Sequence, residues 1–438
     1  MPSALVVGGG LAGLAATAAL AEAGFAVDLF EARGFLGGRA TSYPVLPADE
    51  DSELIDNCQH VLLRCCVNLL DFYRRLDVGD RVRFSGDYYF IEPGGRVSTL
   101  QRGLLPAPLH FAGSFLRLRF LSAADKLAIA RGLVAIRREH KTRHDLDRIS
   151  MLEWLRQKRQ TPGAIDRFWR QVLVSAVNED LDRMAAGHGF QVFWLGFLAR
   201  PDSYQMGVPA VPLACLYSAD VWRRFERVSI HLRSPVASID ARGGVKLPGG
   251  SARQADFYIL CVPPERLDGV APGLAIDTGW VEHSPITGIH LWFDRPITAL
   301  PHATLLDRTM QWMFNKSQGR YIQLVVSASR ALSSLPKSDV IALALRELTE
   351  FFPAAREARL ERSHVVKEMR ATFSALPGLE ARRPGCVTAD SNLFLAGDWT
   401  RSGWPATMEG AVRSGYIAAE AVTRAAGTPL KFLLPDVE

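Results

Sequence analysis

An apolar run interrupted by closely spaced glycines opens the chain and constrains its fold more strongly than any other feature. Residues 4–7 predict a strand, residues 11–23 a helix, and residues 25–30 a second strand. Gly24 ends the helix, because glycine is the preferred residue just after a helix C-terminus. These three elements form one βαβ unit, which places the two strands in a parallel sheet.

The glycines of this unit fall where the pyrophosphate of a dinucleotide would bind. Gly8 allows a tight turn, Gly10 lets the backbone approach a phosphate, and Gly13 lets the helix pack closely on the strand. The helix N-terminus, in the turn that runs into Leu14, supplies backbone donors and a partial positive charge. Glu31 ends the second strand, where a carboxylate can accept hydrogen bonds from ribose hydroxyls. Glycines alone more often mark turns, but this combination is the context that a dinucleotide site requires.

Length and composition indicate two connected domains in a cytoplasmic protein. A chain of 438 residues is too long for one compact core. The formal net charge of +5 is a small excess for this length, and we expect no nucleic-acid partner. The six cysteines show no CxxC pair, which favours reduced thiols, and we expect no metal site. The start of the chain has no basic residue before its apolar run, so we expect no targeting segment.

Two arginines and two glycines after Glu31 distinguish FAD from NAD. Arg33 and Arg39 follow the carboxylate within eight residues and can reach phosphate oxygens in forked geometry. Gly38 and the glycine before it let the chain pass close to a flat ring system. The alternative is a surface loop with two solvated arginines, but the short spacing between Glu31 and these arginines favours FAD. The arrangement resembles the glutathione-reductase-type FAD domain, in particular the flavin amine oxidase and carotenoid desaturase superfamily.

A second segment, near the C-terminus, again leads from a strand through a glycine turn into a helix. Residues 392–396 predict a strand that runs into Gly397 and Asp398, and residues 407–424 predict a helix. The resemblance implies that Asp398 contacts the ribityl or phosphate part of FAD. It also implies that the helix N-terminus faces the flavin and offers a backbone N–H to a flavin carbonyl. The residues at this N-terminus are Ala406, Thr407 and Met408.

Two central segments complete the predicted cofactor domain. Residues 230–239 and 257–262 predict strands, and the second of them is continuously apolar, as a buried strand should be. Val236 matches the position whose backbone meets the adenine in the superfamily. We therefore expect an α/β fold, with a Rossmann-like FAD domain of the glutathione-reductase type and a second, mixed α+β substrate domain. The FAD domain should comprise residues 1–85, 229–275 and 385–438, and the substrate domain residues 86–228 and 276–384.

The substrate domain should open with a β-hairpin and continue with helices and strands. Residues 88–100 predict the hairpin, with a Pro-Gly-Gly turn between two β-prone runs. Helices are predicted at residues 122–140, 149–158, 162–176, 185–198 and 338–351, and strands at residues 286–294, 303–315 and 320–328. Four aromatic residues share a face of the fourth helix, which suits either a core or the wall of an apolar tunnel. They are Phe190, Phe193, Trp194 and Phe197.

Residues 103–121 combine bulky apolar side chains with two arginines and one histidine. Prolines and arginines do not suit a membrane span, whereas leucine, phenylalanine and flanking arginine suit a helix that lies in a bilayer interface. The alternative is a buried segment of the substrate domain. The membrane interpretation predicts a contact through which a lipid could enter. It also predicts a peripheral, monotopic protein on the inner face of the membrane.

A polar segment follows the arginine-bearing loop and precedes an apolar-periodic helix predicted at residues 61–76. It contains Asp56, Gln59 and His60, and it should lie in the crossing between the two domains, beside the flavin. A lone histidine is more often structural than catalytic, so both roles stay open from the residues alone.

Over nearly its whole length the chain resembles the hydroxysqualene dehydroxylase family, which comprises squalene-associated FAD-dependent desaturases. Beyond the FAD motifs, the resemblance rests on five segments. They are residues 55–63, 69–76, 175–179, 206–209 and 403–411. One departure is Cys58, where many members of the family carry glycine.

The resemblance implies reductive removal of the allylic hydroxyl of hydroxysqualene, with FAD as cofactor and a long apolar isoprenoid as substrate. We expect His60 to handle the leaving hydroxyl, because an acid must protonate or hydrogen-bond the oxygen before the C–O bond breaks. Asp56 would orient the histidine, and Gln59 or Asn178 would assist it. The chain has no second dinucleotide fingerprint, so the electron donor stays open.

Three alternatives remain at this point. A carotenoid desaturase of the phytoene type would share the fold, the membrane contact and an apolar tunnel, and would transfer hydride from substrate to flavin. An amine oxidase would need an aromatic cage for an amine. A non-catalytic escort protein would lose the cofactor contacts, and the intact set of glycines and charged residues opposes that interpretation.

Overall fold

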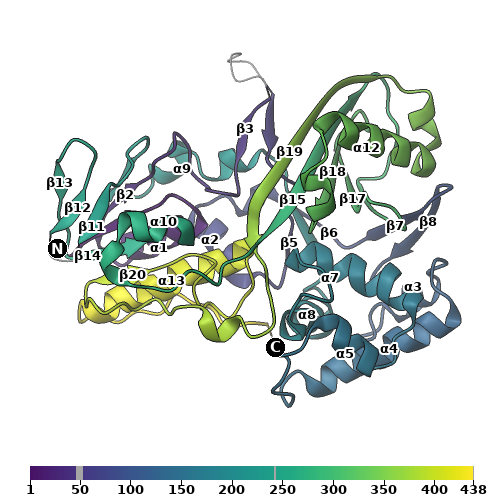
Figure 1. The fold of residues 1–438 in the computed structure, drawn as a ribbon, viewed down its shortest axis with the longest axis horizontal. Helices are drawn as coiled ribbons and strands as arrows, with labels where there is room; N and C mark the ends of the chain where they lie inside the picture. Colours follow the sequence, from purple (N-terminus) through teal and green to yellow (C-terminus); the bar gives the residue numbers. More distant parts are fainter. Residues whose placement is uncertain (46–52, 241–242, 438) are drawn as a thin grey trace.

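A parallel sheet forms the centre of the cofactor-binding half (Figure 1). The computed structural model of the protein describes residues 1–45, 53–240 and 243–437. The sheet has the strand order β10 (Val228–His231), β2 (Ala26–Phe30), β1 (Ser3–Val7), β14 (Phe257–Leu260) and β20 (Leu393–Leu395). All of its pairings are parallel, which confirms the predicted βαβ unit and the α/β class.

Alternating residues of β1 bury against two different layers. Ala4 and Val6 pack with α1 (Leu11–Glu22) and α13 (Met408–Ala425), which lie side by side on one face of the sheet. Leu5 and Val7 belong to a core on the other face, with β11 (Ser238–Asp240), β12 (Gly244–Lys246) and α10 (Pro264–Val270). A strand buried on both faces is apolar throughout, which explains the continuous apolar runs of the sequence.

The prediction of one strand at residues 230–239 is wrong. The segment forms β10 in the parallel sheet and β11 in a separate antiparallel sheet of order β11-β12-β13, where β13 is Ala252–Arg253. Arg233 has a positive φ of 51°, and Pro235 follows it, so the backbone turns between the two strands. Both halves are β-prone, and apolar alternation alone does not reveal the turn.

A seven-stranded sheet dominates the other half. Its order is β19 (Leu360–Phe373), β15 (His283–Phe293), β18 (Tyr321–Ser327), β17 (Trp312–Ser317), β16 (His302–Leu305), β7 (Tyr88–Glu92) and β8 (Arg96–Leu100). The hairpin predicted at residues 88–100 is confirmed as β7 and β8. The single strand predicted at residues 303–315 is wrong, because a turn with Asp307 at a positive φ of 62° separates β16 from β17.

The two faces of this large sheet have different neighbours. On β15, Ile289, Leu291 and Phe293 pack against α12 (Lys337–Phe351), which covers the outer face (Figure 1). Successive side chains of a strand point to opposite sides, so Gly288 and His290 belong to the opposite, inner face. The inner face is the side that carries the polar groups described below.

A group of helices packs beside the large sheet and forms the remainder of the substrate half (Figure 1). It comprises α3 (Ala112–Leu116), α4 (Ala123–Glu139), α5 (Met151–Gln157), α6 (Pro162–Ala164), α7 (Arg170–Val177) and α8 (Ala186–Phe193). Short helical segments at Ile165–Trp169 and Trp194–Leu198 extend α6 and α8, so the predicted helical regions from residue 122 to residue 198 are confirmed. Two further short α-helices are α9 (Ala219–Trp222) and α11 (Arg330–Ser333).

The helix predicted at residues 61–76 is shorter than expected. It starts only at α2 (Val67–Arg75), and the preceding residues form β5 (Leu62–Leu63). β5 pairs with β9 (Met206–Pro209), which also pairs with β6 (Val82–Ser85). This pairing with a distant segment overrides the helical periodicity of residues 61–66.

Residues 103–121 do not form a continuous helix either, and α3 is their only α-helix. Within the described part of the chain, no helix has the length and apolar character needed to cross a membrane. β3 (Ser42–Pro44) and β4 (Leu54–Asp56) form a small antiparallel pair near the crossing between the two halves. All strands of the parallel sheet come from the three segments predicted for the FAD domain, apart from Val228, and the domain limits themselves stay a prediction.

Candidate functional site

The turn between β1 and α1 has the close approaches that its glycines predict. Gly8 has a positive φ of 110°, and a Cβ atom there would lie 2.6 Å from the carbonyl oxygen of Cys261. A Cβ atom on Gly13 would lie 2.0 Å from the carbonyl oxygen of Gly8, so α1 packs directly on the turn. Gly10 is the N-cap of α1, and Leu14 donates the first helical hydrogen bond to its carbonyl oxygen at 2.9 Å.

A second loop closes over this turn, and the shape of the two loops together can be compared with what a pyrophosphate requires. Gly37 donates a hydrogen bond of 2.8 Å to the carbonyl oxygen of Gly9. A Cβ atom on Gly38 would lie 3.0 Å from the Cα atom of Gly10. Two backbones without side chains thus meet at a helix N-terminus whose first N–H groups point outward, as an anion site requires. The residues therefore fit the dinucleotide that the sequence predicts.

Glu31 joins this cradle to the segment that contains Val236. One carboxylate oxygen of Glu31 accepts from the backbone N–H of Gly9 at 2.7 Å, and the other accepts from the backbone N–H of Arg33 at 2.7 Å. The backbone N–H of Ser234 donates to the carbonyl oxygen of Glu31 at 2.9 Å. Val236 lies two residues further along the same segment, and its predicted contact with the adenine stays a prediction.

Arg39 and Asp398 face each other across the site. The guanidinium of Arg39 donates to the carboxylate of Asp398 at 2.6 Å and to the carbonyl oxygen of Ala371 at 3.0 Å. Gly397 has a positive φ of 147°, which residues with a side chain rarely adopt, and its N–H donates to the hydroxyl of Ser414 at 2.9 Å. The two ends of the chain that the sequence assigns to FAD thus meet at one place, and the individual contacts to FAD stay predictions.

Arg383 holds the loop that carries Asp398, and sequence reasoning missed it. Its side chain is fully buried and donates to the carbonyl oxygens of Asp398 and Trp404, both at 2.8 Å, and of Thr400. Glu380 neutralises its charge at 2.6 Å. A lone arginine in a loop carries no motif, so only the fold reveals that it shapes residues 397–404.

The N-terminus of α13 is built as predicted and also has a second role. Thr407 caps it by accepting from the N–H of Gly410 at 3.0 Å, with Ala406 before it and Met408 as the first helical residue. Glu409, in the same turn, is 1% exposed and accepts from the N–H of Leu69 at 2.7 Å. This carboxylate caps the N-terminus of α2, so the first turn of α13 joins these two helices.

The polar segment after β4 comes together around a lysine that the sequence analysis did not single out. Lys316, on β17, donates to the side-chain oxygen of Gln59 at 2.9 Å and lies 3.7 Å from the carboxylate of Asp56. Asp56 also accepts from Ser42 at 2.7 Å and from the N–H of Leu213 at 3.0 Å. Lys316 lies between two polar residues at the end of β17 and belongs to no motif, so only the fold reveals its role.

His60 lies at the end of this segment, and its Nδ1 atom is 2.9 Å from the carbonyl oxygen of Cys58. This contact places the proton of the neutral ring on Nδ1 and leaves Nε2 with a lone pair. Burial lowers the pKa of His60 below its usual value, against the opposing effect of the Asp56 carboxylate. Burial also lowers the pKa of Lys316, which Asp56 partly offsets.

Asn178 has a different environment. Its amide nitrogen donates to the carbonyl oxygen of Ser284 at 3.0 Å and to Thr372 at 2.9 Å, and its oxygen accepts from the N–H of Ala328 at 2.7 Å. It therefore joins α7 to β15, β19 and the end of β18. These bonds occupy the amide with the scaffold, and its predicted assistance to His60 stays untested.

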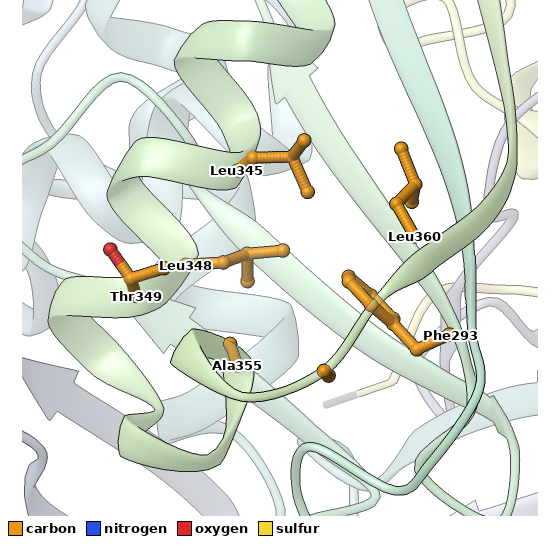
Figure 2. Close-up of a pocket in the computed structure, with 7 residues that line it drawn as sticks. Phe293, Leu345, Leu348, Thr349, Ala355 and Leu360 are labelled. Atoms are coloured by element: carbon orange, nitrogen blue, oxygen red, sulfur yellow. The ribbon is translucent and has the colours of Figure 1, made fainter.

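An apolar pocket of about 160 Å³ opens between α12 and the outer face of the large sheet (Figure 2). Its lining includes Phe293, Leu345, Leu348 and Leu360, and Thr349 contributes the polar side chain seen at its edge. A site for chemistry needs convergent polar or titratable groups, and these lie on the inner face instead. We therefore assign no function to this pocket.

Comparison with known proteins identifies the type of site. The chain matches the family described as flavin containing amine oxidoreductase over residues 11–423. It is 30% identical to a hydroxysqualene dehydroxylase of Sinorhizobium fredii, with 95% of this chain and 97% of that protein covered. It is 25% identical to a zeta-carotene desaturase of a Synechocystis strain, with 95% and 96% covered.

Solved structures agree at the level of the fold. An oxidoreductase from Methanosarcina mazei superposes with a TM-score of 0.68 at 17% identity, covering 94% of this chain and 98% of that one. A putrescine oxidase superposes with a TM-score of 0.64 at 17% identity, covering 97% and 99%. The family match and the glycine-lined cradle together establish FAD as the cofactor of this site.

Proposed function

We propose that this chain, which belongs to the family of flavin containing amine oxidoreductases, removes the allylic hydroxyl of hydroxysqualene reductively and yields squalene and water. One observation carries the proposal. The chain is similar over almost its full length to hydroxysqualene dehydroxylases from three organisms, at 29% to 30% identity. The inner polar groups of the large sheet support it, because a lipid alcohol needs a polar site within an apolar binding region.

The proposed reaction breaks the allylic C–O bond, forms a C–H bond at the same carbon and releases the oxygen as water. Reduced FAD, when bound, supplies the hydride with both electrons. The residues of the chain must deliver a proton to the leaving oxygen and keep water away from the positive charge that develops on the allylic carbons.

His60 is the residue that we propose for the proton transfer. Its Nδ1 atom is held by Cys58, so Nε2 is the atom that takes up a proton and passes it on. Asp56 favours the protonated ring, and Gln59, oriented by Lys316, lies next in sequence. The ion pair of Arg39 and Asp398 joins the neighbouring cofactor loops. We assign the proton transfer to the segment that contains His60.

The direct test uses the holoenzyme reduced anaerobically with dithionite and then mixed with hydroxysqualene. We expect oxidation of the flavin and formation of squalene in equal amounts, measured by absorbance and by gas chromatography. The same enzyme mixed with squalene should keep its flavin reduced. Oxidation of the flavin by hydroxysqualene without squalene as product would contradict the proposal.

A carotenoid desaturase is the second candidate, and the similarity to zeta-carotene desaturases favours it specifically. In that case hydride would move from substrate to cofactor. Oxidised holoenzyme mixed anaerobically with zeta-carotene would then bleach its flavin absorbance. For the proposed dehydroxylase, we expect the oxidised flavin to persist in this mixture.

We also propose that residues 103–121 contact a membrane from which the isoprenoid substrate enters. Leu104, Leu109 and Leu116 are 106%, 58% and 67% exposed, which is unusual for large apolar side chains that cluster in one short segment. Exposed arginines flank them, at positions 102, 117 and 119. Apolar side chains beside basic ones suit an anionic lipid surface.

Aromatic contacts lead inward from this segment. The ring of Phe111 lies 4.5 Å from that of Tyr204 and 6.3 Å from that of Phe197. Phe197 in turn lies 6.4 Å from Tyr88 of the large sheet. By contrast, Phe193 lies 4.6 Å from Trp169 in a fully buried core. The predicted aromatic face is therefore core at Phe193 and meets the proposed membrane segment at Phe197.

A further inference from the structure

A buried polar pair lies on the inner face of the large sheet, outside the groups discussed so far. His290 of β15 and Gln323 of β18 are direct cross-strand partners in the antiparallel register. Both side chains are 0% exposed. Cross-strand partners point to the same side of a sheet, so the imidazole and the amide are neighbours on the inner face.

The polar atoms of this pair lack the partners that burial demands. Among the residues that the structure describes, neither the Nε2 atom of His290 nor either amide atom of Gln323 has a hydrogen-bond partner. A buried donor or acceptor left unpaired costs about 1–3 kcal/mol. Native proteins keep few such groups, and those they keep often serve a ligand.

The other ring nitrogen of His290 has a partner in Tyr321. The phenol oxygen of Tyr321 lies 2.7 Å from Nδ1 of His290. Burial keeps the ring neutral, because it lowers the pKa of His290 to about 3. A phenol that donates to Nδ1 satisfies both groups and leaves Nε2 with a proton. His290 then offers a donor, while the amide of Gln323 offers both a donor and an acceptor.

The pair lies against the segment that leads to His60. A Cβ atom on Gly288, two residues before His290 on the same face, would lie 3.8 Å from Nε2 of His290. The same atom would lie 3.1 Å from the carbonyl oxygen of Asn57 and 3.8 Å from the Cα atom of Cys58. The unpaired donor of His290 therefore lies close to the turn whose carbonyl orients His60.

We propose that His290 and Gln323 bind the hydroxyl group of an isoprenoid alcohol and so make the site prefer the alcohol to the corresponding hydrocarbon. A hydroxyl donates one hydrogen bond and accepts two, which matches the donors and the acceptor of this pair. The inference rests on the proposed function and deepens it, since it names the residues that recognise the leaving group. His290 and Gln323 are specificity residues, and the proton transfer remains with His60.

The test measures binding to the oxidised holoenzyme, where no turnover occurs. Hydroxysqualene and squalene are titrated separately, and the change in flavin absorbance gives each dissociation constant. We expect the wild type to bind the alcohol more tightly than the hydrocarbon. Gln323→Leu should weaken alcohol binding about 10-fold, as loss of a buried hydrogen bond to a ligand would, and leave squalene binding unchanged. His290→Phe should act in the same direction.

Gln311, which directly precedes β17, provides the matched control. Both amide atoms of Gln311 bond the backbone of Ser327, at 2.8 Å and 3.1 Å. Gln311→Leu should lower the melting temperature and leave the ratio of the two dissociation constants unchanged. Gln323→Leu should leave the melting temperature of the ligand-free protein unchanged or higher, because it removes an unpaired buried amide.

The outcomes separate this inference from the proposed function. An unchanged preference for the alcohol in Gln323→Leu overturns the inference, and so does a fall in melting temperature with equal loss of both ligands. Turnover of hydroxysqualene by the reduced wild type is measured independently. If turnover fails while Gln323→Leu still removes the preference for the alcohol, the proposed function fails and the inference stands.

Discussion

Gly13 is a position where one methyl group decides whether the cofactor cradle can form. The Cβ atom of an alanine would lie 2.0 Å from the carbonyl oxygen of Gly8 and 3.3 Å from Val6. Backbone cannot yield as a flexible side chain can, so α1 would shift away from the turn. We expect Gly13→Ala to purify with little flavin. The ratio of flavin absorbance at about 450 nm to protein absorbance at about 280 nm measures the flavin content.

Gly79→Ala is the matched control for this prediction. A Cβ atom at Gly79 would meet nothing within 4 Å, and its backbone does not need a positive φ. This variant should retain its flavin. A full flavin content in Gly13→Ala would show that the close packing of α1 is dispensable for the cofactor.

His60 is the second residue whose role a single substitution can test. We expect His60→Ala to lower kcat for dehydroxylation about 100-fold, a typical effect of removing a general acid. His144→Ala, at an exposed position, should have no effect. Full turnover by the His60 variant would exclude it from the proton transfer.

The pH dependence follows from the direction of the pKa shift of His60. Burial lowers this pKa below the usual 6.5, so the ring becomes protonated only at lower pH. The rate of a step that needs protonated His60 should therefore rise as pH falls through and below 6.5. We expect this rise in kcat/KM of the wild type and its loss in His60→Gln. A rate that falls with falling pH in this range would point to another acid.

At the scale of elements, the first turn of α13 ties the C-terminal helix to α2. Glu409 accepts from the N–H groups of Asn68 and Leu69, at 3.2 Å and 2.7 Å, and from the amide of Asn68 at 2.9 Å. Removing the carboxylate leaves these buried donors unpaired. We expect Glu409→Ala to lower the free energy of unfolding by about 2 kcal/mol, measured by urea denaturation. The exposed Glu361→Ala should change it by less than about 0.5 kcal/mol.

The loop that carries Asp398 offers a second test at this scale. Arg383 bonds three of its carbonyl oxygens from a fully buried position. We expect Arg383→Met to weaken FAD retention and to lower the melting temperature, because the loop loses its internal partner. The neighbouring Arg382 is half exposed, and Arg382→Met should retain flavin like the wild type. Equal flavin content in the two variants would contradict the role of Arg383.

Elements could be predicted where local signals and tertiary contacts agree. The βαβ unit, the hairpin of β7 and β8, and α13 each have turn or capping residues at their ends. The prediction of a single strand was wrong for residues 230–239 and for residues 303–315. Each segment contains a turn at a non-glycine residue with a positive φ. The prediction of helix at residues 61–66 was wrong because a strand distant in sequence, β9, pairs with this segment. In all three cases a long-range contact or an unmarked turn overrides a valid local pattern.

For the molecule as a whole, the exposed leucines of residues 103–121 predict lipid binding. We expect the protein to sediment with vesicles that contain phosphatidylglycerol, and less with pure phosphatidylcholine, because the flanking arginines favour anionic lipid. The double variant Leu104→Ser, Leu109→Ser should lose most of this binding while it keeps its flavin. Val387→Ser, an exposed apolar position elsewhere, serves as control. Equal sedimentation of the double variant and the wild type would remove the membrane proposal.

Short local patterns were sufficient to predict the cofactor half of the protein. Gly8, Gly10 and Gly13 must lie in one turn because they are neighbours in the chain, and backbone sterics then dictate the geometry of the cradle. The segment with Arg39 and the segment with Asp398 each carried a recognisable pattern. Chemistry that depends on a few adjacent residues can therefore be inferred without a fold.

The packed fold brings together the groups that separate segments of the chain contribute. Lys316 and Gln59 are hydrogen-bonded although 257 residues separate them along the chain. Other residues also acquire their roles through partners outside their own segment, namely Arg383, Glu409, His290 and Gln323. Sheet register places His290 opposite Gln323, and burial leaves both without partners among the described residues. Register and burial are properties of the packed molecule, because no local sequence pattern specifies which strands become neighbours.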